Sequence, residues 1–173
     1  KLDGLGLLNN LVEVKELRQQ LVDNGTTEVL IPLIYSKNTY CQKRAIRALS
    51  HLSIIKSCAV QTATASGGVI EALVQSLSSK DRYDVEYASR ILCNITVVDR
   101  FELLVAKANA LRPLVSILST HPDSICQNIA SAVLQNISCH TADALLLVEN
   151  LFPTLARGLI HDEDDIRKSC HAI

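Results

Sequence analysis

A pattern of four residues returns at a nearly constant spacing along the chain. It reads LNNL at 8–11, LSHL at 49–52, LCNI at 92–95 and LQNI at 134–137. The third positions, residues 10, 51, 94 and 136, are separated by steps of 41, 43 and 42 residues and are called the asparagine column below. Repeats of this length are supersecondary units that bury their apolar faces only by stacking on one another. The repeat therefore predicts an elongated stack of similar units.

A second pattern keeps the same phase and divides each unit into helices. Apolar residues spaced i, i+1 and i+4 form one stripe of a helix, and such a stripe begins at Leu30, Leu73, Leu114 and Leu155. Five residues before each stripe stands a Gly or an Asn, the residue types that best tolerate a left-handed turn. A small residue stands six positions before the asparagine column in three units, where a neighbouring helix would pack closely. These turn and small residues are Gly25, Gly68, Asn109, Asn150, Ala45, Ala88 and Ala130.

Each unit therefore reads as a short helix, a sharp turn, a second helix, a polar loop and a longer third helix. The composition fits packed helices, because Leu, Ile, Val and Ala dominate the apolar residues while the chain has only 6 Gly and 4 Pro for the turns of a β-domain. Pro32 falls inside the second helix of the first complete unit. A proline there removes a backbone hydrogen bond, which predicts a late helix start or a kink.

These features together resemble the armadillo repeat family, and the resemblance extends over the whole chain. It implies an all-α fold, a right-handed α-solenoid of stacked three-helix repeats. A HEAT-like α-α superhelix, built from two-helix units of similar length, is the structural alternative. The expected units are a partial repeat (third helix) at 1–14, repeats at 15–55, 56–98 and 99–140, and a truncated repeat at 141–173 that stops inside its third helix.

The third helices are expected to line a groove for a partner. Residues four apart on a helix project in the same direction, so the asparagine column and the positions four and eight before it form one strip. The resemblance implies that the column amides clamp the main chain of an extended or helical segment. The candidate groove residues are Asn10, Lys43, Arg47, His51, Glu86, Arg90, Asn94, Asn128, Ala132 and Asn136.

The residue types in this strip predict what the groove binds. Import receptors of the family carry tryptophan four positions before the asparagine, but this chain has no Trp and places Arg47 and Arg90 there. Recognition of a basic import signal is therefore not expected. Lys43, Arg47 and neighbouring Arg44 instead favour a partner segment that is acidic near this repeat.

Other function classes find little support. A net charge of −1, a pI near 6.6 and 3% aromatic residues speak against nucleic-acid binding, and no long apolar stretch predicts membrane insertion. The sequence has no nucleophile elbow, phosphate-binding loop or HExxH pattern, so neither enzyme activity nor a cofactor is expected. Cys139-His140 and Cys170-His171 do not complete a metal site, and the acidic run 162–165 is interpreted as a helix cap.

Two functions remain. The first is a protein–protein interaction scaffold or adaptor that binds a partner segment in the groove. The alternative is an intramolecular regulatory or structural spacer that controls an attached domain of a longer parent chain. Six dispersed cysteines predict reduced thiols in a cytoplasmic or nuclear protein. Apolar residues at both ends, such as Leu7, Leu11 and Ile173, predict flanking repeats in the parent, or ends that pair in a dimer.

Overall fold

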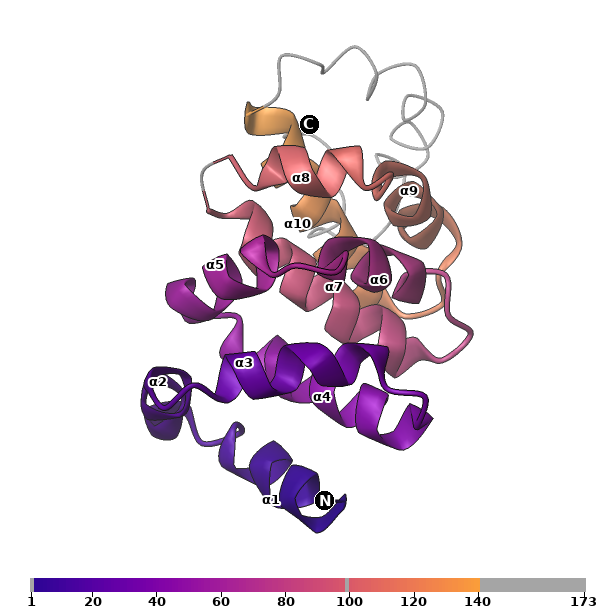
Figure 1. Cartoon of the computed structure of the whole chain (residues 1–173). Coiled ribbons are helices and arrows are strands. Elements are labelled where there is room, and N and C mark those ends of the chain that lie inside the picture. Colours follow the sequence, from indigo (N-terminus) through magenta and orange to yellow (C-terminus); the bar gives the residue numbers. More distant parts are fainter. Residues whose placement is uncertain (1, 99, 141–173) are drawn as a thin grey trace.

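The computed structural model describes residues 2–98 and 100–140, and every regular element in these residues is a helix. A single helix, α1, comes first and three triplets of helices follow it (Figure 1). The element η1 in the list below is a 3-10 helix that continues α3. The bounds are α1 Leu2–Leu11; α2 Lys15–Asp23, α3 Thr26–Leu30, η1 Ile31–Tyr35 and α4 Thr39–Leu52; α5 Lys56–Thr64, α6 Val69–Ser76 and α7 Arg82–Thr96; α8 Glu102–Lys107, α9 Leu111–Thr120 and α10 Ser124–His140.

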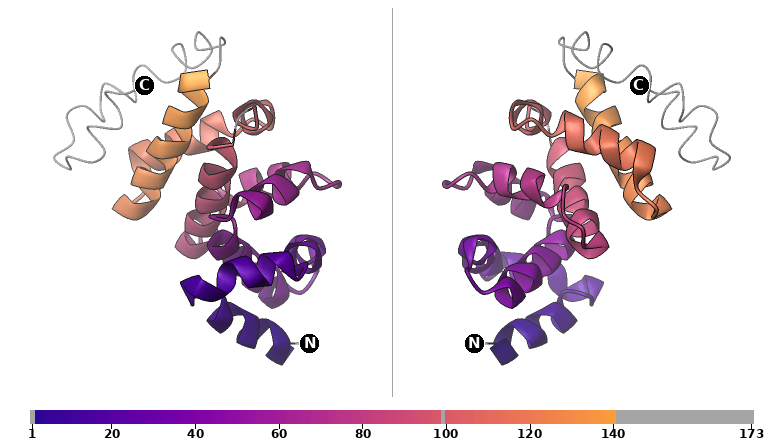
Figure 2. Two further views of the ribbon diagram at one scale, coloured as in Figure 1. Left: turned by 90° about the vertical axis from the view of Figure 1, so that its left-hand side faces the viewer. Right: turned by 90° about the vertical axis from the view of Figure 1, so that its right-hand side faces the viewer.

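The triplets stack in chain order and form an α-solenoid. The long helices α1, α4, α7 and α10 follow one another along the stack, and each packs against the next (Figures 1 and 2). The small residues Ala45, Ala88 and Ala130 on these helices are fully buried, as the sequence predicted for sites of close helix approach. Leu30, Leu73 and Leu114 of the apolar stripes join the same continuous core. Units of three helices distinguish this fold from the two-helix HEAT arrangement.

The predicted left-handed turns separate the first and second helices of each triplet. Gly25, Gly68 and Asn109 have φ angles of 77°, 76° and 62°, a region that residues with a Cβ atom seldom adopt. Asn150, the fourth member of this set, lies outside the described residues. So do the truncated repeat at 141–173, the acidic run 162–165 and Cys170-His171.

Pro32 ends the α-helical hydrogen-bond pattern of its triplet early. The helix α3 stops at Leu30 and the chain continues as the 3-10 helix η1, with the proline in its first turn. Ile34, at the end of the apolar stripe, is still buried in the core. The kink predicted from sequence is therefore a change of helix type that preserves the buried stripe.

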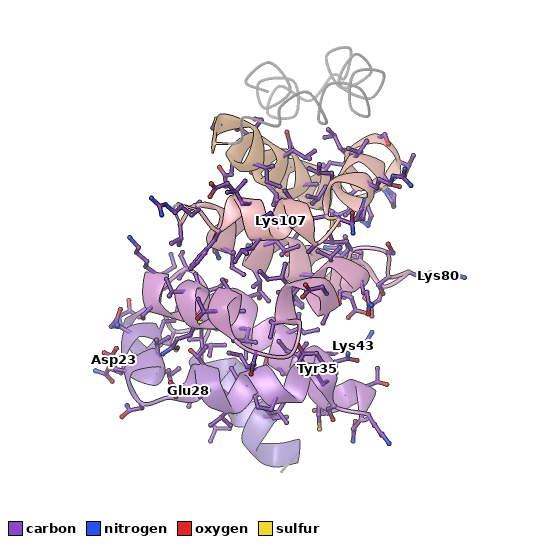
Figure 3. The ribbon with its side chains drawn as sticks, turned by 45° about the horizontal axis from the view of Figure 1, so that its top comes forward. Asp23, Glu28, Tyr35, Lys43, Lys80 and Lys107 are labelled. Carbon is purple, nitrogen blue, oxygen red and sulfur yellow. The ribbon has the colours of Figure 1, made fainter. Side chains whose placement is uncertain are left out.

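The polar loops cap the long helices and join neighbouring triplets. The side chains of Asn38 and Asp81 accept hydrogen bonds from the first backbone N–H groups of α4 and α7. Lys80 projects outward at the tip of the loop between α6 and α7 (Figure 3). Ion pairs cross between triplets at these helix starts: Lys43 pairs with Asp81 and with Asp84, the latter at 3.3 Å, and Arg82 pairs with Asp123 at 2.8 Å.

Among residues 2–98 and 100–140, no helix is both long enough and apolar enough to cross a membrane. The cysteines in this part of the chain, Cys41, Cys58, Cys93, Cys126 and Cys139, are free thiols. His, Cys, Asp and Glu side chains do not gather there in groups of three that could hold a metal ion.

Candidate functional site

A recess of about 570 Å³ opens on the face formed by α4 and α7, and we call it the central recess. Both helices contribute strip residues that the sequence singled out, while the turn after α1 and the helix α2 close one side. The α10 helix contributes a single residue to the lining. The recess is lined by Glu13, Arg18, Arg47, Ser50, His51, Ile54, Glu86, Tyr87, Arg90, Cys93, Asn94 and Ile129.

The column asparagines Asn94 and Asn136 bind the preceding triplet through their amides. The Nδ2 of Asn94 donates to Ser53 Oγ at 2.8 Å, and the Nδ2 of Asn136 donates to Thr96 Oγ1 at 3.0 Å. Each acceptor hydroxyl stands two residues after the column position of its own helix. The amides are therefore held in a fixed orientation by a neighbouring repeat.

Each of these hydroxyls also donates a hydrogen bond to a carbonyl three residues earlier in the chain, which leaves its oxygen free to accept from the asparagine. Ser53 donates to the carbonyl of Ser50 at 3.1 Å, and Thr96 donates to the carbonyl of Cys93 at 2.9 Å. Ser138, two residues after the next column position, donates to Gln135 in the same way at 2.8 Å. Because the hydroxyl proton is used within its own helix, the oxygen lone pairs face the following repeat.

His51 is the asparagine-column residue of α4, and it has no hydroxyl partner in the preceding unit. The position two residues after column residue 10 is Val12, which is fully buried and has no hydroxyl. The ring instead lies beside Arg18, with Nη2 at 3.5 Å from Nδ1. Burial lowers the pKa of His51, and the nearby positive charges of Arg18, Arg47 and Arg90 lower it further. The imidazole is consequently neutral near pH 7.

The cationic residues of the strip are paired with acids from their own or adjacent elements. Arg47 forms an ion pair with Glu13 across the α1–α4 contact. Arg90 binds the Oε1 of Glu86 through Nε at 3.1 Å and Nη2 at 2.9 Å. The Glu86 side chain is mostly buried and also lies 3.7 Å from Arg82. The strip is therefore a network of compensated charges rather than the open cationic surface that the sequence suggested.

A second hollow of about 440 Å³, the tyrosine hollow, adjoins the recess and shares Arg47 and Tyr87 with it. Tyr83 and Tyr87 stack with their ring centres 6.1 Å apart. Lys43 lies in this hollow between Asp81 and Asp84, the latter at 3.3 Å. Its hydrogen bond to Asp81 raises the pKa of Lys43 and lowers that of the Asp81 carboxyl. The hollow is lined by Tyr40, Lys43, Arg44, Arg47, Asp81, Tyr83, Asp84 and Tyr87.

Other candidate residues lie outside the two hollows. Asn10 is exposed on α1, whereas its neighbour Asn9 is fully buried and donates to the carbonyl oxygens of Leu5 at 2.9 Å and Arg44 at 3.1 Å. Asn128 and Ala132 lie half-buried on α10. The structure thus gathers the α4 and α7 candidates around the two adjoining hollows and places the α10 candidates one step further along the stack.

Sequence reasoning missed several residues of the recess. Tyr87 and Ile129 both stand seven positions before the asparagine column, a spacing that also brings residues onto one helix face. Including that spacing would have identified them. Glu13 and Arg18 come from the turn after α1 and from α2, where the repeat supplies no matching signal.

The comparisons with known proteins support the repeat assignment. Residues 15–54 match the family model described as Armadillo/beta-catenin-like repeat. The search of curated proteins found no match.

Solved structures agree in fold. An engineered protein superposes with a TM-score of 0.81 at 28% identity, covering 95% of this chain and 41% of its own length. A computationally designed armadillo repeat protein for modular peptide recognition has a TM-score of 0.84 at 19% identity, covering 98% and 72%. A designed armadillo repeat protein in complex with the peptide (KR)4 has a TM-score of 0.80 at 19% identity, covering 99% and 72%.

Proposed function

We propose that this armadillo-type solenoid, whose residues 15–54 match the armadillo family model, is a protein-binding scaffold. Its groove, along α4, α7 and α10, holds an extended segment of a partner. The designed relatives named for peptide recognition support binding in general. The partner, and the residues that contact it, are our inference from the groove of this chain. The role requires no catalytic step, and we infer that the chain is not an enzyme.

The proposal rests on the hydrogen bonding of the two column amides, those of Asn94 and Asn136. In each, one N–H is held by a hydroxyl of the preceding triplet. Among the residues that the structure describes, nothing bonds to the Oδ1 of Asn94 or Asn136, and the second N–H of each amide is also unused. A fixed amide with one donor and one acceptor left over matches the C=O and N–H of an extended main chain. Asn94 is one of the residues that line the central recess.

We further propose that the partner segment is acidic where it crosses α4. Lys43 and Arg47 motivated this preference, and the positive charges around His51 support it. A cytoplasmic or nuclear location fits the free cysteines in the described part of the chain.

The test separates partner binding from bracing between repeats. A partner is first identified by proximity labelling with the full chain, and its affinity is then measured for two double variants. Asn94→Ala/Asn136→Ala removes the amides, whereas Ser53→Ala/Thr96→Val removes the hydroxyls that hold them but leaves the amides in place. Each lost amide bond to the partner is expected to cost roughly 0.5–1.5 kcal/mol of binding free energy.

We expect the asparagine variant to bind clearly more weakly than the hydroxyl variant. Equal losses of affinity in the two variants would mean that the amides act only through the stability of the stack. Unchanged affinity in the asparagine variant would refute the groove as the binding site. Thermal unfolding of both variants shows whether their stability losses match, as their shared hydrogen bonds require.

A further inference from the structure

The central recess contains more positive than negative charge. Three guanidinium groups, of Arg18, Arg47 and Arg90, face two carboxylates, of Glu13 and Glu86. One positive charge is therefore left over while His51 is neutral. Burial lowers the pKa of His51, and the charges of the three arginines lower it further against one glutamate, Glu13.

The neighbouring tyrosine hollow has the same excess of one positive charge, with Lys43, Arg44 and Arg47 against Asp81 and Asp84, but its lysine is already paired twice. The ammonium of Lys43 already contacts the carboxylates of Asp81 and Asp84, so a third carboxylate there would meet repulsion. An acidic residue of a partner is therefore better accommodated in the recess than beside Lys43. This moves the expected acidic contact toward the His51 end of α4.

The hydrogen bonding of His51 adds a donor to the recess. A guanidinium can only donate, so the contact between Arg18 and Nδ1 makes that nitrogen the acceptor. The proton of the neutral ring is then on Nε2. Protonation of Nδ1 would place two donors against each other, unless an anion nearby offsets the added charge.

We propose that the central recess is a subsite for one side-chain carboxylate of the bound segment. The carboxylate is held by Arg18, whose guanidinium pairs with no carboxylate among the residues that the structure describes, with His51 as an additional donor. The subsite rests on the proposed scaffold function and specifies its partner chemistry. A bound carboxylate also favours the protonated form of His51. The affinity for an acidic segment therefore rises as the pH falls through the range in which His51 takes up a proton, with Glu13, Arg18, Arg47 and Arg90 as the charged groups facing the ring.

The experiment uses the full chain and labelled peptides with blocked ends. A peptide of alternating glutamate and serine is compared with one of alternating glutamine and serine, by fluorescence anisotropy at low ionic strength. We expect the glutamate peptide to bind about tenfold more tightly at neutral pH, the value of one charge-assisted hydrogen bond. We expect this preference to grow at about pH 5.5, where glutamate is still ionised.

Variants locate the effect. Arg18→Gln removes the unpaired guanidinium and is expected to abolish most of the preference for the glutamate peptide. Glu86→Gln/Arg90→Gln removes a paired acid and base without changing the net charge, and it is expected to keep most of that preference. His51→Gln is expected to keep most of the preference at neutral pH but to remove its growth at lower pH. Arg112→Gln, an exposed arginine on α9 away from the recess, is the control and is expected to bind like the wild type.

The proposal is overturned if the two peptides bind equally, or if the preference survives in Arg18→Gln. It is also overturned if a phosphoserine peptide of equal net charge binds more tightly than the glutamate peptide, because the site would then select phosphate. If the glutamine peptide binds and this binding depends on Asn94 and Asn136, the scaffold function stands even though the carboxylate subsite fails.

Discussion

The hydrogen bond from Asn94 to Ser53 predicts a measurable energetic coupling between two repeats. The two residues are 41 positions apart in sequence, and their side chains meet at 2.8 Å. Asn94→Ala and Ser53→Ala each break this bond, and the double variant breaks it only once. A double-mutant cycle therefore isolates its contribution to the free energy of unfolding.

The structure sets the size of the effect. A neutral hydrogen bond contributes about 0.5–1.5 kcal/mol net, and more when its loss strands a buried group. Ser53 is only 1% exposed, but its hydroxyl still donates to Ser50 at 3.1 Å after the amide is removed. The coupling energy should therefore be about 1 kcal/mol, which corresponds to a change in Tm of roughly 2–4 °C for a chain of this size.

The assay is urea unfolding of the wild type, both single variants and the double variant, followed by circular dichroism. Equal m-values are required, because they show that all four proteins unfold the same amount of surface. The Asn136 and Thr96 pair provides a second, independent cycle. Coupling energies below about 0.3 kcal/mol in both cycles, which is within the scatter for non-interacting sites, would refute the conclusion that these bonds join the repeats.

Three further predictions concern other parts of the molecule. Asp81→Asn should lower the stability at neutral pH by a few tenths of a kcal/mol. Because the hydrogen bond to Lys43 lowers the pKa of Asp81 in the folded protein, this stabilisation is lost as the pH falls through the folded-state pKa. Unfolding curves at acid pH should therefore show no difference between the variant and the wild type. Gly68→Ala should lower the free energy of unfolding by roughly 1–2 kcal/mol, because residue 68 has a φ of 76°, and Gly68→Asn should lower it clearly less. Chemical denaturation measures both, and equal losses would contradict the role of this residue as a left-handed turn. Burial raises the pKa of Cys126 to about 11, so mass mapping after alkylation should show it reacting far more slowly than exposed Cys139.

The repeat pattern predicted the parts of the fold that depend on spacing alone. The left-handed positions Gly25, Gly68 and Asn109, and the buried column that contains Ala88, follow from the period, because equivalent residues meet equivalent surroundings in a stack. The strip on α4 and α7 followed for the same reason. Pro32 correctly predicted where the α-helix of this triplet is interrupted. That the chain continues there as a 3-10 helix, with Ile34 still buried, could not be predicted from the proline alone.

The acidic partners of the strip's basic residues could not be predicted from the strip itself. Lys43 meets Asp81 across a separation of 38 residues, and the acid belongs to the loop that caps the next long helix. Arg47 meets Glu13 on the other side. A strip read along one helix contains no information about side chains contributed by the repeats before and after it. For the same reason the hydroxyls that hold Asn94 and Asn136 were not foreseen.

The pairing of each column amide with the hydroxyl of the preceding repeat has a consequence for how the chain can change in length. Ser53 and Thr96 accept from the next asparagine at sequence separations of 41 and 40 residues, so they are interchangeable acceptors. Removing residues 56–98 as a block would bring Ser53 opposite Asn136 at the separation that Thr96 now has from Asn136, 40 residues, with an amide donor and a hydroxyl acceptor as before. Any two repeats that become neighbours in this way can form the same amide-to-hydroxyl hydrogen bond. Whole repeats can therefore be gained or lost without leaving an unpaired polar group at the new junction.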